Sequence, residues 1–75
     1  MKNEDLIRMA NQISQFFEPY PEDEAIEGTA GHIKNFWDPR MKKQLFTMLD
    51  AGETNGLLPL AHRAAEHLKQ QGGIS

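Results

Sequence analysis

Residues 36–41 read Phe36-Trp37-Asp38-Pro39-Arg40-Met41, and this stretch decides the fold because it separates two segments with helical periodicity. Pro39 suits the first turn of a helix, since its φ is fixed near the helical value and it lacks an N–H. It also disfavours the αR conformation at Asp38, whose carboxylate can then cap the free N–H groups of the new helix. We therefore expect one helix to end near Trp37 and the next to begin at Pro39. Phe36, Trp37 and Met41 should pack at the corner.

Four segments place their apolar residues on one face of a helical wheel: 4–18, 22–37, 39–51 and 57–70. None alternates with the period of two that is typical of strands. The sequence therefore predicts an all-α fold, a small bundle of four short amphipathic helices, or three helices and a looser fourth. The expected apolar faces contain Leu6, Met9, Ala10, Ile13, Phe16 and Phe17; Ala25, Ile26, Thr29, Ala30, Ile33, Phe36 and Trp37; Met41, Leu45, Phe46, Met48 and Leu49; and Leu57, Leu60, Ala61, Ala64, Ala65 and Leu68.

Local signals set the expected helix ends. Asn3 is the expected N-cap of the first helix, and the prolines of the 18–21 segment end it. Gly52 is expected to end the third helix in the left-handed conformation, and Pro59 belongs in the first turn of the fourth. Residues 70–75 should form a frayed tail of a single helical domain, 1–75.

Gly28 and Gly31 lie on the polar side of the 22–37 helix. Each costs the helix about 1 kcal/mol relative to Ala. Two interpretations remain open. The glycines are a tolerated weakness or a local bend, or they form a Gly-x-x-Gly surface that lets another backbone approach closely.

Length and composition exclude several classes of protein. A chain of 75 residues buries only about 60% of the surface that its unfolded form exposes, so its stability is marginal without a partner. It has no Cys, which excludes disulfides, thiolate zinc sites and iron–sulfur ligation by this chain. A net charge of −3 with interspersed acids and bases predicts no nucleic-acid binding. No signal peptide and no apolar run of membrane-spanning length is present, so we expect a soluble protein that is not exported and makes no membrane contact.

Side chains that could carry chemistry lack the spacing that chemistry needs. His62 and His67 are five residues apart, about 140° around a helix, and His32 lies on another helix. The hydroxyls of Ser14 and Thr47 lie mid-helix on polar faces without the glycines that flank a nucleophile. We therefore predict no catalytic, cofactor-binding or metal-binding residue, and no catalysis by this chain alone.

The aromatic residues are more informative, and all of them lie within residues 16–46. Phe16, Phe36 and Phe46 are expected in the core. The others lie at helix ends, where full burial is harder in so small a body, and interfaces favour Trp, Tyr, Phe and Arg. For Phe17, Tyr20 and Trp37, a partner surface and a place in the monomer both remain open. For Asp38, the alternatives are capping the next helix and pairing with Arg40 across a subunit contact. The predicted partner-binding residues are Phe17, Tyr20, Trp37, Asp38 and Arg40.

Several blocks of the chain resemble a known family. They are Arg8-Met9-Ala10-Asn11-Gln12-Ile13, Phe16-Phe17, Tyr20-Pro21, His32-Ile33 and Phe36-Trp37-Asp38-Pro39-Arg40-Met41. Their order and spacing over roughly residues 5–68 are similar to the delta subunit of NAD-dependent formate dehydrogenase.

The resemblance implies a small, non-catalytic accessory subunit of a soluble cytoplasmic complex that oxidises formate and reduces NAD. It implies binding to the large molybdopterin-bearing alpha subunit and a role in assembly, cofactor insertion or stability. The molybdenum or tungsten pterin, the iron–sulfur clusters and FMN are then expected on other subunits.

Three rival interpretations remain. The chain is a transient maturation chaperone of that enzyme, an unrelated small helical interaction module, or a small enzyme or metal protein that uses its histidines. The isolated chain could also self-associate through the surface meant for its partner.

Overall fold

The computed structural model describes residues 1–72 and contains four α-helices in that part of the chain. They are α1 (Asn3–Phe17), α2 (Glu22–Phe36), α3 (Pro39–Ala51) and α4 (Pro59–Gln70). No strand occurs among these residues, so the predicted all-α fold of four helices is confirmed. The fourth helix begins at Pro59, two residues later than predicted.

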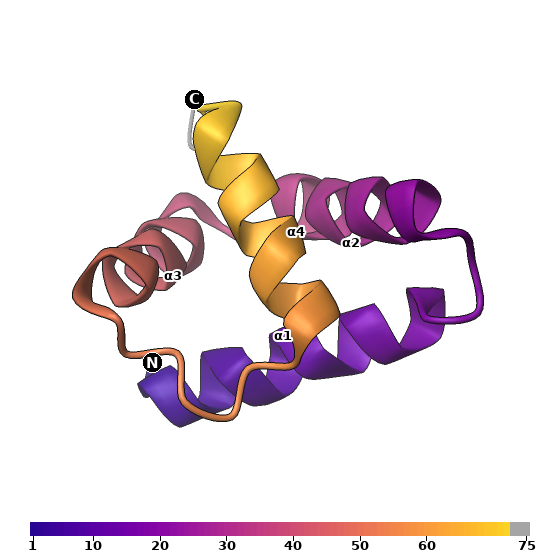
Figure 1. Ribbon diagram of the computed structural model, residues 1–75. Coiled ribbons are helices and arrows are strands. Elements are labelled where there is room, and N and C mark those ends of the chain that lie inside the picture. Colours follow the sequence, from indigo (N-terminus) through magenta and orange to yellow (C-terminus); the bar gives the residue numbers. More distant parts are fainter. Residues whose placement is uncertain (73–75) are drawn as a thin grey trace.

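The helices form a hairpin with a helix laid across it (Figure 1). α1 and α2 lie side by side and are joined by the short segment 18–21. α4 crosses both of them, and α3 lies at the other end of the molecule, opposite that segment. The long connection from α3 to α4, residues 52–58, passes along α1 (Figure 1).

All four helices contribute to one core. Its largest fully buried side chains include Leu6, Ile33, Leu45, Met48 and Leu68. α4 contributes mainly small side chains, and these let its axis lie close to the helices that it crosses. The buried cluster consists of Leu6, Ala10, Ala30, Ile33, Trp37, Leu45, Phe46, Met48, Ala61, Ala64, Ala65 and Leu68.

The backbone of the corner between α2 and α3 is built as predicted, but Phe36, which was expected to pack there, is 75% exposed. Trp37 has an extended backbone (φ −82°, ψ 139°) and ends α2, and Pro39 is the first residue of α3. The Oδ1 atom of Asp38 accepts a hydrogen bond of 2.9 Å from the Met41 N–H. Nζ of Lys42, which is 7% exposed, donates to the Lys34 carbonyl at 3.2 Å and so links the two helices across the corner.

Two of the other predicted helix ends have different outcomes. Gly52 ends α3 with φ 72°, as predicted, and its N–H donates to the Leu49 carbonyl. The prediction that Asn3 caps α1 is wrong, because Asn3 is already helical and Lys2 precedes the helix without a side-chain cap. The Asn3 Oδ1 atom instead accepts from Nε2 of Gln44 at 2.8 Å, so the side chain is used to join α1 to α3.

A polar residue of α1 fixes the connection between α3 and α4. Nδ2 of Asn11 donates to the Gly56 carbonyl at 2.9 Å, and its Oδ1 atom accepts from the Leu58 N–H at 2.9 Å. Both groups of one amide are therefore used to hold the chain just before Pro59, where α4 begins.

The described chain stays hydrogen-bonded beyond the end of α4. The Gln71 N–H donates to the His67 and Leu68 carbonyls, each at 3.2 Å. The last part of the predicted frayed tail, 73–75, lies outside the described residues.

Candidate partner-binding surface

Aromatic side chains gather on the outside of the α1–α2 hairpin. Phe16 is 69% exposed, Phe36 is 75% exposed and Tyr20 is 47% exposed, whereas Phe17 is half-buried. His32 is exposed on α2 and lies beside Phe36. We call these five residues, Phe16, Phe17, Tyr20, His32 and Phe36, the aromatic surface.

The rings of the aromatic surface contact one another in two groups. On the α1 side, the centroid of Phe17 lies 5.1 Å from that of Phe16, edge to face, and 5.6 Å from that of Tyr20. On the α2 side, the His32 and Phe36 centroids are 4.6 Å apart with an interplanar angle of 32°. These separations are typical of favourable aromatic pairs, so each group holds its rings in place while leaving their outer faces open.

A shallow pocket lies between the two groups. It has a volume of about 320 Å³ and is lined by Ile13, Phe16, Phe17 and His32. Its lining is almost entirely apolar. An apolar side chain of a partner could therefore enter it and bury its own surface together with that of the surrounding rings.

Gly28 explains how the Phe17 ring comes to lie against α2. A Cβ atom on Gly28 would lie 2.5 Å from Cε1 of Phe17. Of the two interpretations of Gly28 and Gly31, close approach therefore applies to Gly28, although its neighbour is a ring and not another backbone. A Cβ on Gly31 would meet nothing within 4 Å.

The structure revises which aromatic residues are buried. Phe46 is 7% exposed, as predicted for the core, but the same prediction is wrong for Phe16 and Phe36. Phe16 lies at the margin of the apolar stripe of α1, and Phe36 is the last residue of α2, so neighbouring helices cover neither ring. Their position next to a proline-containing segment, 18–21 or 38–39, was the available signal that they lie at an edge.

The predicted partner-binding residues are not all on one surface. Phe17 and Tyr20 belong to the aromatic surface. Trp37 is 6% exposed and packs in the core, so the expectation that its ring is hard to bury is wrong. The α2–α3 corner turns this ring inward and the Phe36 ring outward. Asp38 and Arg40 are exposed at the corner, Asp38 as the cap of α3, and their part in partner binding stays a prediction.

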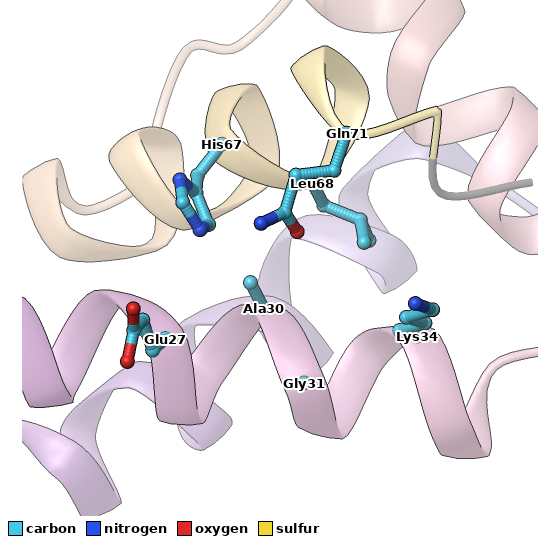
Figure 2. Close-up of a pocket in the computed structure, with 7 residues that line it drawn as sticks. All are labelled: Glu27, Ala30, Gly31, Lys34, His67, Leu68 and Gln71. Atoms are coloured by element: carbon cyan, nitrogen blue, oxygen red, sulfur yellow. The ribbon is translucent and has the colours of Figure 1, made fainter.

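A second pocket lies between α2 and α4 (Figure 2). Its volume is about 220 Å³, and Figure 2 shows Glu27 and His67 pointing toward one another across it from the two helices. Gly31 leaves part of it open. The two side chains form no hydrogen bond or ion pair with each other.

Three further polar side chains form contacts within their own helices. His62 Nδ1 lies 2.9 Å from Glu66 Oε1 one turn along α4. The Ser14 hydroxyl donates to the Asn11 carbonyl at 2.9 Å, and the expectation that Ser14 lies on a polar face is wrong, because the residue is 0% exposed. Thr47 Oγ1 donates to the Lys43 carbonyl at 2.9 Å. Within residues 1–72, no three His, Asp or Glu side chains are grouped closely enough to hold a metal ion.

In residues 1–72 no helix is long and apolar enough to cross a membrane.

Comparison with known proteins gives one positive result. Comparison with curated proteins and with solved structures gave no match. Residues 5–70 match the model of a family described as the NADH-dependent formate dehydrogenase delta subunit, FdsD. This match spans all but the two ends of the sequence, and the chain therefore belongs to the formate dehydrogenase delta subunit family.

Proposed function

We propose that this chain is a non-catalytic accessory subunit that binds the large molybdopterin-bearing alpha subunit of a cytoplasmic formate dehydrogenase. In this role it supports the assembly, cofactor insertion or stability of that subunit. The observation that carries the proposal is the aromatic surface, in a chain whose family is named for one subunit of a complex. Single exposed apolar residues are ordinary, but a contiguous group of large rings is typical of a protein–protein interface.

The residues of this chain do not fit the cofactors of such an enzyme. Iron–sulfur clusters need thiolate ligands, and the sequence contains no Cys. The described part of the chain also has no group of His, Asp or Glu that could hold a metal ion. We propose that the molybdenum or tungsten pterin, the iron–sulfur clusters and FMN are held by other subunits, and for the iron–sulfur clusters the lack of Cys supports this.

The energetic reason for a partner lies in the exposure of the rings. Burying a large apolar side chain contributes about 1.5–3 kcal/mol, and this contribution is missing for Phe16 and Phe36 in the monomer. Docking on the alpha subunit would supply it. Because the rings already contact one another, little side-chain freedom is lost when they are covered.

Co-purification tests the proposal. Cells that make the whole complex carry this chain with an affinity tag, either unchanged or with Phe16→Ser and Phe36→Ser. We expect the unchanged chain to recover the alpha subunit and the double variant to recover at least about tenfold less, because central aromatic residues dominate interface energies. Lys43→Ser with Gln70→Ser is the matched control, since both residues are exposed on other helices.

The result distinguishes the alternatives. If the unchanged chain never purifies with the alpha subunit under gentle conditions, the accessory-subunit proposal fails. About one copy per alpha subunit in mature, active enzyme identifies a permanent subunit. Binding to immature enzyme with almost none in the mature enzyme identifies a transient maturation chaperone instead.

A further inference from the structure

The acidic residues of the chain are concentrated at one end of the α1–α2 hairpin. Residues 18–27 contain five of the eleven acids, Glu18, Glu22, Asp23, Glu24 and Glu27, and no Lys or Arg. Glu22 accepts a hydrogen bond of 2.7 Å from Arg63 on α4. The other four form no ion pair with any residue that the structure describes. Three of these carboxylates, Glu18, Asp23 and Glu24, therefore lie without a basic partner at the turn of the hairpin, whereas Glu27 faces the pocket between α2 and α4.

This acidic end continues directly into the aromatic surface. On α2, Glu24, Gly28, His32 and Phe36 follow one another at intervals of four residues, so they form one row along the helix. The Phe17 ring lies on Gly28 within this row, and Tyr20 belongs to the acidic segment itself. The aromatic surface is thus an apolar strip whose end at residues 18–24 is negative.

The shape of the surface favours a helix as its occupant. It lies over two neighbouring helices, with a pocket of about 320 Å³ between their rings. Grooves between helices bind the apolar face of an amphipathic helix, whereas a peptide that adds a β-strand pairs with the edge of a sheet. Residues 1–72 contain no sheet edge.

The charge of the surface favours a basic occupant over a second copy of this chain. A second copy has a net charge of −3 and brings its own acidic segment to the contact. Arg8 is the base on α1, and its Nη1 atom lies 3.3 Å from Oδ1 of Asp5, so it is already paired within its own chain. Like charges at an interface suppress a wrong partner, and opposite charges increase the rate of association with the right one.

We propose that the aromatic surface binds an amphipathic helix of the large subunit, with apolar anchors on one face and Lys or Arg at the end that meets Glu18, Asp23 and Glu24. This inference rests on the proposed function, because it describes how the accessory subunit recognises the enzyme. One anchor enters the pocket between Ile13, Phe16, Phe17 and His32. The basic end determines the direction in which the helix lies.

Two charge variants of the full chain test the basic end. The first carries Glu18→Gln, Asp23→Asn and Glu24→Gln. The second carries Glu4→Gln, Glu53→Gln and Glu66→Gln, which also removes three negative charges and includes an acid in the first turn of a helix. Circular dichroism verifies that both are folded. Their Kd for the purified alpha subunit is measured from about 50 to 500 mM salt, a range over which exposed charge pairs are increasingly screened.

We expect the first variant to bind about tenfold more weakly at low salt and to show a flatter salt dependence, since three exposed ion pairs would be lost. The control should stay within about twofold. Hydrogen exchange on the alpha subunit should show protection of a helical segment with Lys or Arg at one end. Equal Kd values for both variants at every salt concentration, or protection of a segment without Lys or Arg, would overturn the inference.

Failure of this inference is distinguishable from failure of the proposed function. If the unchanged chain does not bind the alpha subunit at all, the proposed function fails first. If Phe16→Ser with Phe36→Ser abolishes binding while the two charge variants behave alike, the docking surface stands and the basic helix does not. Sedimentation of the isolated chain tests the other occupant, and self-association tighter than alpha-subunit binding would overturn the inference.

Discussion

The inner face of α4 carries small buried side chains, whereas the outer face of the α1–α2 hairpin carries large exposed ones. Ala61, Ala64 and Ala65 are 0% exposed where α4 crosses the other helices, while Phe16 and Phe36 are mostly in solvent. The alanines bury little area each, but they let helices cross closely. The exposed rings bury little area in the monomer although they are large. The difference indicates that close helix crossing determines the interior, and that stability of the isolated chain does not explain the rings.

Trp37 and Phe36 provide the sharpest test of this comparison, because they are adjacent in sequence and opposite in burial. We expect Trp37→Ala to lower the free energy of unfolding by about 3–5 kcal/mol, since it leaves a large cavity in the core. Phe36→Ala should change it by less than about 0.5 kcal/mol, as exposed substitutions usually do. Urea denaturation followed by circular dichroism measures both. A loss at Phe36 as large as that at Trp37 would show that the ring is buried in the monomer.

Ala64→Leu tests the other side of the comparison, the close crossing of α4. Added methylene groups at a fully buried position force the helices apart, and we expect a loss of about 1–3 kcal/mol in the free energy of unfolding. Gln70→Leu adds a similar side chain at an exposed position of the same helix and is the control. If Ala64→Leu stabilises the chain, the crossing contains unfilled space and the alanines are not required for close approach.

The two regions were also predictable to different degrees. Local rules were sufficient for the corner, because the Asp38 cap, the start at Pro39 and the left-handed Gly52 each depend on a few neighbouring residues. The exposure of Phe16 and Phe36 was harder to predict, because both lie on apolar stripes and their place beside a proline-containing segment shows only that they are near a helix end; the packing of the other helices decides whether such an end is covered. The role of Asn11 is non-local too, since its partners Gly56 and Leu58 are 45 and 47 residues away.

The candidate site was likewise predictable only where it depends on neighbouring residues. Phe17 and Tyr20 were expected at a partner surface from their place at a helix end, and they lie in the aromatic surface. His32 was considered as a solvated or packing residue, or as a metal ligand, and not as part of a partner surface. Its contact with Phe36 follows from their spacing of four residues on α2. Its place in a larger surface depends on α1, which brings Phe16 and Phe17 to the same pocket.

The smallest expected effect concerns Gly31 and Gly28, which lie one turn apart at the border of the two regions. Gly31→Ala should raise the free energy of unfolding by about 0.5–1 kcal/mol, because Ala favours the helix and a Cβ there meets nothing within 4 Å. Gly28→Ala should gain less or lose stability, since its Cβ displaces the Phe17 ring. It should also weaken alpha-subunit binding, whereas Gly31→Ala should not. Thermal unfolding and the binding assay measure the pair, and identical behaviour of the two variants would show that the Phe17 ring is not held against Gly28.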